Sequence, residues 1–289
     1  MANTFLTPDI IAREALMVLR NNAVMANLVY RDYSSDFVGA VGDTITVRKP
    51  ASFVANEFTD TITVQDATED SITIQMDKHL DVSFKVTAKQ MSMDIEEFSR
   101  QLLVPAMQAF ADKVDKYLLA LESQVTGRVT PAGDAITPAD IIAARKMLTK
   151  NAAPQADRHL VVGSDAEADL LGNELFISAE KVGDEGSALR EASLGRKFGF
   201  DTYVDQNADN AAGSYTPALA FHRNAFALVT RQLALPMGAQ NAAIVNYDGF
   251  GLRVVYGYDM ATKSDTVSID MLCGVKLLDE KLAAVIVGK

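Results

Sequence analysis

Three histidines have the side chains best suited to acid–base chemistry, but their positions do not support a catalytic site. His79, His159 and His222 are far apart in the sequence, and none lies in a zinc-peptidase, nucleophile-elbow or nucleotide-binding motif. No sequence typical of a strained elbow surrounds a serine, so a Ser-His-Asp triad has no support. We expect surface or interface histidines, no catalytic residue and no enzyme. A soluble enzyme that uses His222 and Asp205 is the least favoured alternative.

The sulfur and carboxylate groups do not indicate a metal or redox centre either. Cys273 is the only cysteine, which excludes an intrachain disulfide and a cysteine-rich zinc site. It lies in an alternating apolar run, so we expect a small buried side chain rather than a nucleophile. The stretch DQNADN, residues 205–210, lacks the glycine and the glutamate that a calcium loop needs. We therefore expect no metal and no cofactor.

Two adjacent cations, Arg48 and Lys49, end the stretch GDTITVRKP at residues 42–50. Neighbouring residues of a strand point to opposite faces, so both side chains cannot easily bind one anion. The proline that follows suits a strand at the edge of a sheet, where charges discourage unwanted pairing. Protection of an edge is favoured over anion binding.

The composition limits the partners of the chain. The 289 residues carry a net charge of −11, and a general nucleic-acid binder would need a cationic footprint instead. No segment approaches the roughly 20 apolar residues of a membrane helix, so we expect no membrane partner. With 48% hydrophobic residues, the chain can build a large core.

The hydrophobic pattern predicts two protruding segments and a mixed body. The spacing of apolar residues over 7–19 predicts an amphipathic helix with Leu16 and Leu19 on its apolar stripe, and an apolar patch follows at 24–30. This arm needs a partner surface. Between residues 43 and 86, apolar and polar residues alternate, which predicts a long antiparallel ribbon that is barely stable alone.

The body combines helices and strands. Apolar residues recur every three or four positions over 94–121, which predicts the longest helix, interrupted by Pro105. Thr137 caps a helix that runs to about Leu148, and Ser164 caps a shorter one. Strands are predicted at 160–162, within 199–205 and 219–235, and over 251–288. The fold class is α+β.

The order of these parts resembles the major capsid proteins of tailed bacteriophages with the HK97-type fold, in particular the P22 coat-protein-like branch. The resemblance covers essentially the whole chain. It rests on five stretches in sequence order: GDTITVRKP, EEFSRQLLVPAMQAFADKVDKYLLALE, SLGRKFGFDTYVD, AFHRNAFALVTRQLALP and GLRVVYGYDMATKSDTVSIDMLCGVKLLD.

The resemblance implies a division into named parts. These are an N-arm (1–41), an extended E-loop (42–91), a peripheral domain with the spine helix (92–134), an axial domain (135–250) and a β return to the peripheral domain (251–289). The large inserted domain of the P22 coat protein has no counterpart here. Because no scaffolding segment precedes the arm, we expect a separate scaffolding protein.

The resemblance also implies a function. The chain would be a major capsid protein that self-assembles as pentamers and hexamers into an icosahedral shell around double-stranded DNA, without binding that DNA specifically. It would assemble in the host bacterial cytoplasm and reside in the virion, with a portal as a partner and a decoration protein as a further candidate partner. The alternative is the shell of an encapsulin-like cellular compartment. The residues expected to contact neighbouring subunits are Arg48, Lys49, Lys78, Leu16 and Leu19.

Overall fold

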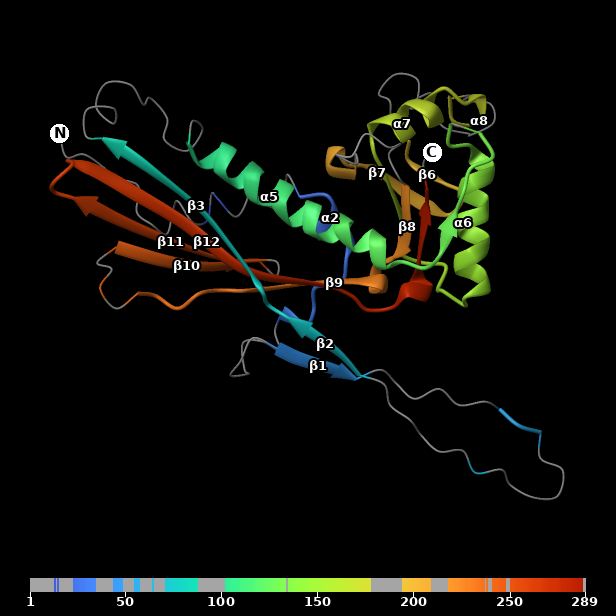
Figure 1. The fold of residues 1–289 in the computed structure, drawn as a ribbon, viewed down its shortest axis with the longest axis horizontal. Coiled ribbons are helices and arrows are strands. Elements are labelled where there is room, and N and C mark those ends of the chain that lie inside the picture. Colours follow the sequence, from blue (N-terminus) through green and yellow to red (C-terminus); the bar gives the residue numbers. More distant parts are fainter. Residues whose placement is uncertain are drawn as a thin grey trace.

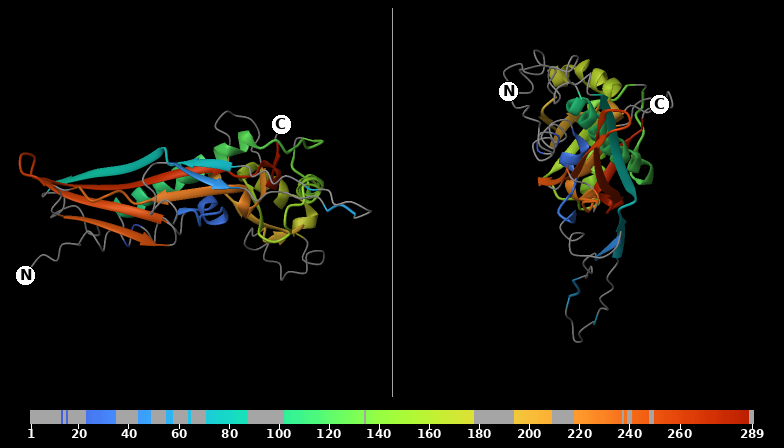
Figure 2. Two further views of the ribbon diagram at one scale, coloured as in Figure 1. Left: turned by 90° about the horizontal axis from the view of Figure 1, so that it is seen from below. Right: turned by 90° about the vertical axis from the view of Figure 1, so that its left-hand side faces the viewer.

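The computed structural model describes residues 13, 15, 23–34, 44–48, 55–57, 64, 71–87, 102–133, 135–177, 194–208, 218–236, 238, 241–247 and 250–287. These residues form the predicted α+β fold, with two large sheets and a separate pair of strands. A long five-stranded sheet and helix α5 occupy one end of the elongated molecule, and a six-stranded sheet with three helices occupies the other (Figures 1 and 2).

The five-stranded sheet is antiparallel throughout and has the spatial order β10-β11-β12-β3, with β9 paired to the later part of β12. The strands are β3 (Lys78–Thr87), β9 (Phe226–Arg231), β10 (Asn241–Tyr247), β11 (Phe250–Asp259) and β12 (Ser264–Leu277). Alternate side chains of β12, among them Ile269 and Cys273, are fully buried. Burial raises the pKa of the Cys273 thiol to about 12, so the prediction of a buried small side chain is confirmed.

Helix α5 (Val104–Leu119) packs on the buried face of this sheet and continues into the 3₁₀ turn η2 (Ala120–Gln124). It corresponds to the second half of the predicted long helix, because residues 91–101 lie outside the described part of the chain. The backbone at residues 102 and 103 is π-helical, and α5 begins directly afterwards. Pro105 is therefore the second residue of α5, directly after the π-helical residues, so the predicted interruption lies where the helix changes its hydrogen-bond pattern.

The six-stranded sheet is mixed, with the order β4-β13-β8-β5-β7-β6. Its strands are β4 (Arg128–Val129), β5 (Arg158–Val162), β6 (Arg196–Lys197), β7 (Phe200–Val204), β8 (Ala218–His222) and β13 (Ala283–Ile286). One face packs against α6 (Pro138–Lys150), α7 (Ser164–Leu171) and α8 (Glu174–Ile177) around a second apolar core. The other face adds Val161 and Phe221 to the core around α5.

The capping residues in the sequence predicted the starts of α6 and α7, beside the six-stranded sheet, to within one residue. Thr137 caps α6 as predicted, and its backbone N–H donates to Asp140 Oδ2 at 2.8 Å in a reciprocal capping box. The predicted cap of α7 was one residue late, because Gly163 holds the cap position and Ser164 is already the first helical residue.

Both large sheets contain strands from each side of the predicted boundary between residues 250 and 251. Strands β9 and β10 precede it but belong to the five-stranded sheet, whereas β13 follows it and belongs to the six-stranded sheet. The chain crosses between the sheets at two adjacent 3₁₀ turns, η4 (Arg223–Ala225) and η5 (Glu280–Leu282). The backbone N–H of Leu278 donates to the Ala225 carbonyl at 2.7 Å beside this crossing. Hydrophobic alternation cannot reveal such a crossing, because strands of both sheets read alike.

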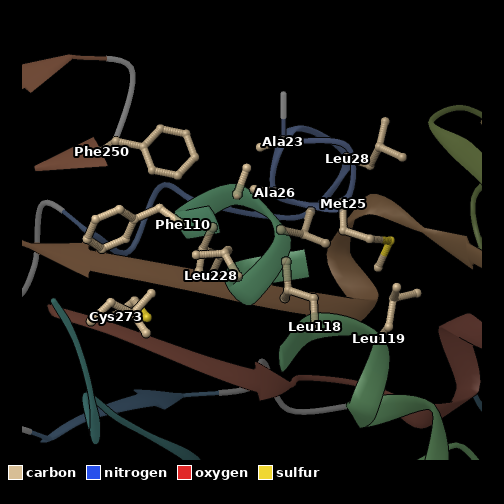
Figure 3. Packing of buried hydrophobic residues seen from close by; sticks show 14 of the residues in the cluster. Ala23, Met25, Ala26, Leu28, Phe110, Leu118, Leu119, Leu228, Phe250 and Cys273 are labelled. Atoms are coloured by element: carbon tan, nitrogen blue, oxygen red, sulfur yellow. The ribbon is translucent and has the colours of Figure 1, made fainter. Parts of the chain in front are cut away.

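The N-terminal segment 23–34 packs within its own subunit. Its short helix α2 (Met25–Leu28) lies across α5 (Figure 3). Met25, Leu28 and Val29 join the core around α5, which is called the central core below. Tyr30 then bridges to β9, with its N–H 3.0 Å from the Phe226 carbonyl. The expectation that this apolar patch needs another surface is therefore wrong for residues 23–34, because α5 and β9 of the same chain provide that surface.

Candidate assembly surface

Strands β1 (Thr44–Arg48) and β2 (Ser71–Gln75) form a two-stranded ribbon that lies to one side of both large sheets (Figure 1). The antiparallel register sets Ile45 opposite Ile74 and Val47 opposite Ile72. Directly opposed residues share a face, so these four side chains form one apolar face, and the predicted alternation of both strands is confirmed.

The ribbon is seated on the body by this apolar face. Ile74 is fully buried and, with Met76, contacts Ala227 and Val229 of β9. Ile45 and Val47 pack more loosely against the same cluster. Since a two-stranded ribbon is barely stable alone, this small core fixes the direction in which the ribbon leaves the body.

A glycine permits the close crossing of the chain at the base of the ribbon. Where β2 passes into β3, the backbone runs directly over Gly274 of β12. A Cβ atom on Gly274 would lie 2.3 Å from the Gln75 carbonyl oxygen and 3.1 Å from Met76 Cα. No side chain fits there without moving backbone, so Gly274 sets how closely the ribbon approaches the sheet.

The opposite face of the ribbon is polar and exposed. Arg48 lies at the end of β1 opposite Ser71, and its side chain is exposed on this face. The other members of the face are Thr44, Thr46, Thr73 and Gln75. Lys49, Leu16 and Leu19 lie outside the described residues. The structure thus places one of the five predicted contact residues on the exposed ribbon.

Lys78, the remaining candidate, makes contacts within its own subunit. Its Nζ lies 2.5 Å from Asp77 Oδ2 and 5.6 Å from the centre of the Tyr117 ring on α5. The hydrogen bond to Asp77 raises the pKa of Lys78. It lies at the start of β3, away from the exposed face of the ribbon that carries Arg48.

The outer face of the five-stranded sheet carries a polar cluster that sequence reasoning missed. Arg253 of β11 forms an ion pair with the buried carboxylate of Asp270 on β12, and His79 Nε2 lies 3.5 Å from Asp270 Oδ2. Asp81 stands opposite Asp270 in the β3–β12 register and accepts a hydrogen bond from Ser268 Oγ at 2.9 Å. Only the strand register could have revealed this cluster.

The histidines do not converge on one site. His79 is half-exposed on the polar cluster, as expected of a surface residue. His222 is buried, contrary to expectation, and its Nδ1 accepts the Asn224 N–H at 3.2 Å at the start of η4. Burial lowers the pKa of both His159 and His222.

The described part of the chain holds neither a metal-binding group nor a membrane-spanning helix. No three His, Cys, Asp or Glu side chains in these ranges are placed to share a metal ion. No helix in them is long and apolar enough to span a membrane.

The family comparison gives one match over more than half of the chain. A family model described as phage capsid protein matches residues 68–269. The comparison with curated proteins gave no match.

Solved structures with a similar fold include several shells. A chain from Mycobacterium phage Che8 has a TM-score of 0.67 and 21% identity over 91% of this chain and 90% of its own. A chain from the capsid of cyanophage P-SCSP1u also scores 0.67, with 15% identity over 92% and 88% of the two chains. A chain of a virus-like particle from Pyrococcus furiosus scores 0.57, with 11% identity over 96% and 97%. At these identities the likeness establishes the fold.

Proposed function

Because the chain belongs to the phage capsid protein family, we propose that its copies assemble as pentamers and hexamers into an icosahedral shell around double-stranded DNA. The family makes it a major capsid protein and a structural component of the virion.

The ribbon is the observation that carries this proposal. Its apolar face is seated on β9, while its polar face, with Arg48 at one end, is exposed. A two-stranded ribbon that is seated on the body by one face gains little stability for its own subunit. It is well placed to lie across a neighbour, which supports an E-loop that begins near residue 42. Within the expected range 42–91, however, β3 (Lys78–Thr87) is a strand of the five-stranded sheet and not part of the ribbon.

The proposed contacts are Arg48, Lys49, Lys78, Leu16 and Leu19. Arg48 has the strongest support because it is exposed on the ribbon and the chain around it is acidic. Lys78 has weaker support because it lies at the start of β3, away from the exposed face of the ribbon. Many weak contacts suffice in a shell, since each subunit makes several at once.

The remaining partners follow from what a shell around DNA requires. We propose a separate scaffolding protein and a portal, with a decoration protein as a further candidate partner. The net charge of −11 supports a wall that encloses DNA without binding it tightly. Assembly would take place in the host bacterial cytoplasm, and no catalytic step is assigned to the chain.

Electron cryomicroscopy of particles formed with the scaffolding protein present tests the proposal. We expect closed shells with five-fold and six-fold clusters, in which the ribbon of one subunit lies on the next. A chain that stays monomeric under every assembly condition, with scaffold supplied, would overturn it.

The fold of the Pyrococcus furiosus virus-like particle keeps an encapsulin-like compartment as the second candidate. The contents of native particles distinguish a phage capsid from an encapsulin-like compartment. Nuclease-protected double-stranded DNA supports the capsid, whereas a protein cargo without DNA supports the compartment.

A further inference from the structure

Strand β9 lies between the central core and the ribbon (Figure 1). Its side chains alternate in direction, so Phe226 and Leu228 enter the central core while Ala227 and Val229 face the ribbon. On the ribbon side they are buried in a small cluster, called the ribbon seat below, which consists of Ile74, Met76, Ala227 and Val229. Helix α5 and the ribbon are therefore separated here by the thickness of one strand.

The N-terminal segment covers the edge of β9 that faces away from β12. The N–H of Tyr30 donates to the Phe226 carbonyl at 3.0 Å, and the N–H of Leu228 donates to the Tyr30 carbonyl at 3.0 Å. Farther along β9, the N–H of Thr230 donates to Ser34 Oγ at 3.3 Å. Residues 30–34 therefore occupy the place of a neighbouring strand along this edge.

Tyr33 joins this edge to the ribbon seat. Its side chain packs against the ribbon seat, as do Ile45 and Val47 of β1. The centre of its ring lies 4.7 Å from that of Tyr30, the residue that is paired with β9. One short stretch of chain thus contacts the edge of β9 through Tyr30 and the ribbon seat through Tyr33. The ribbon seat is complete only while residues 30–34 stay on β9.

The start of the same segment is fastened to α5. Asp115 on α5 is 1% exposed, and its Oδ2 accepts the Val24 N–H at 2.8 Å while its Oδ1 accepts the Ala26 N–H at 3.1 Å. Between these two fastenings, Met25 and Leu28 are buried in the central core. The N-terminal segment is therefore held to α5 at its start and to β9 and the ribbon seat at its end.

We propose that residues 23–34 are a latch that couples α5 to the direction of the ribbon, taking the ribbon's proposed role in assembly as given. With the latch on β9, Tyr33 completes the ribbon seat and the ribbon holds one direction. When the latch leaves β9, the ribbon seat loses Tyr33, and a two-stranded ribbon with a smaller apolar support changes its direction. A contact on one side of β9 thereby controls an element on the other side.

A distance measurement between two spin labels tests the latch in unassembled chains. The exposed residues Thr73 on the ribbon and Gln108 on α5 are replaced by cysteine and labelled, with labelled chains diluted among unlabelled ones. Cys273 is fully buried and its thiol pKa is about 12, so it should not react. We expect one narrow distance distribution in the otherwise unchanged protein. A broad distribution there would overturn the proposal.

Two variants open the latch from opposite sides of β9. Tyr33→Ala removes the ring from the ribbon seat and should shift and broaden the distribution, whereas Tyr33→Phe keeps the ring and should leave it narrow. Asp115→Ala leaves two buried N–H groups without their acceptor, so the start of the latch should detach. It should broaden the distribution as well, although β9 separates Asp115 from the ribbon. A distribution that stays narrow in either alanine variant would overturn the latch.

Ser34→Ala repeats the test at the surface if Asp115→Ala does not fold. It removes the hydroxyl that accepts the Thr230 N–H and should broaden the distribution, and an unchanged distribution would overturn the latch. Leu170→Ala is the control for general loss of stability, because Leu170 is fully buried in the separate core beside the six-stranded sheet. Its distribution should stay narrow. Broadening in Leu170→Ala would show that any destabilisation moves the ribbon, which contradicts a specific latch.

Particle assembly by Tyr33→Ala distinguishes the latch from the proposed function. We expect fewer particles by sedimentation, because a ribbon without a fixed direction meets its neighbour less often. A ribbon that loosens in Tyr33→Ala while particles form at the parent's yield would support the latch and count against the role of the ribbon in assembly. A narrow distance distribution in Tyr33→Ala would overturn the latch whatever the yield of particles.

Discussion

Arg253 on β11 and Asp270 on β12 form a bidentate ion pair across neighbouring strands. Arg253 Nε donates to Asp270 Oδ1 at 2.8 Å, Nη2 donates to Oδ2, and Nη1 donates to the Ala234 carbonyl at 2.6 Å. On its other side, Asp270 stands opposite Asp81 of β3. Arg253 therefore neutralises a buried carboxylate that would otherwise face another acid.

Replacement of Arg253 by methionine should lower the free energy of unfolding by about 3 to 5 kcal/mol, because it leaves the buried Asp270 without its cation. Urea denaturation at pH 7 measures this loss. The double variant Arg253→Met with Asp270→Leu should regain most of the stability, since no buried charge remains. A loss below about 1 kcal/mol in the single variant would show that Asp270 is compensated by other groups.

Gly274→Ala should damage assembly more than it damages the body. The new Cβ would lie 2.3 Å from the Gln75 carbonyl oxygen, so the start of the ribbon must move away from β12. We expect a cost of about 1 to 3 kcal/mol in unfolding free energy and a larger loss of assembled particles, measured by sedimentation.

Gly257→Ala is the control for this change, because a Cβ at that position on β11 meets nothing within 4 Å. It should fold and assemble like the parent protein. Normal yields of particles from Gly274→Ala would show that the direction of the ribbon is not important for assembly.

Charge reversal at Arg48 tests the proposed contact of the ribbon with a neighbour. Arg48 is exposed on β1, so Arg48→Glu should change the unfolding free energy by no more than about 1 kcal/mol. Assembly, followed by light scattering, should be reduced, most strongly at low salt where charge repulsion is least screened. Arg48→Lys keeps the charge and should assemble. Equal assembly of the glutamate and lysine variants would exclude a charge contact at this position.

The N-terminal segment should be indispensable for folding. Met25 is fully buried between α2 and the central core, so Met25→Ala should cost about 2 to 5 kcal/mol. Asn27 lies exposed on the same helix, and Asn27→Ala should cost no more than about 1.5 kcal/mol for the loss of its hydrogen bond to Ala23. Denaturant titration of both variants measures these two losses of unfolding free energy. A deletion of residues 1–30 that leaves the body fully stable would contradict this account.

The sequence by itself determined the local elements. Alternation placed the apolar faces of β1, β2 and β12, and the capping residue Thr137 placed the start of α6. These features depend on neighbours within a few residues, so their patterns can be read directly along the chain. The order of the elements was enough to indicate the family.

The tertiary structure decided which distant segments meet. Asp115 binds the N–H groups of Val24 and Ala26 some 90 residues earlier, as their separations of 91 and 89 positions show. The ion pair of Arg253 with Asp270 depends on the β11–β12 register, and the place of β13 depends on a crossing at η5. Hydrophobic periodicity indicates that one face of an element is buried, but it does not indicate which other element covers that face. For this reason the sequence marked residues 24–30 as apolar, and only the folded chain showed that α5 and β9 cover them.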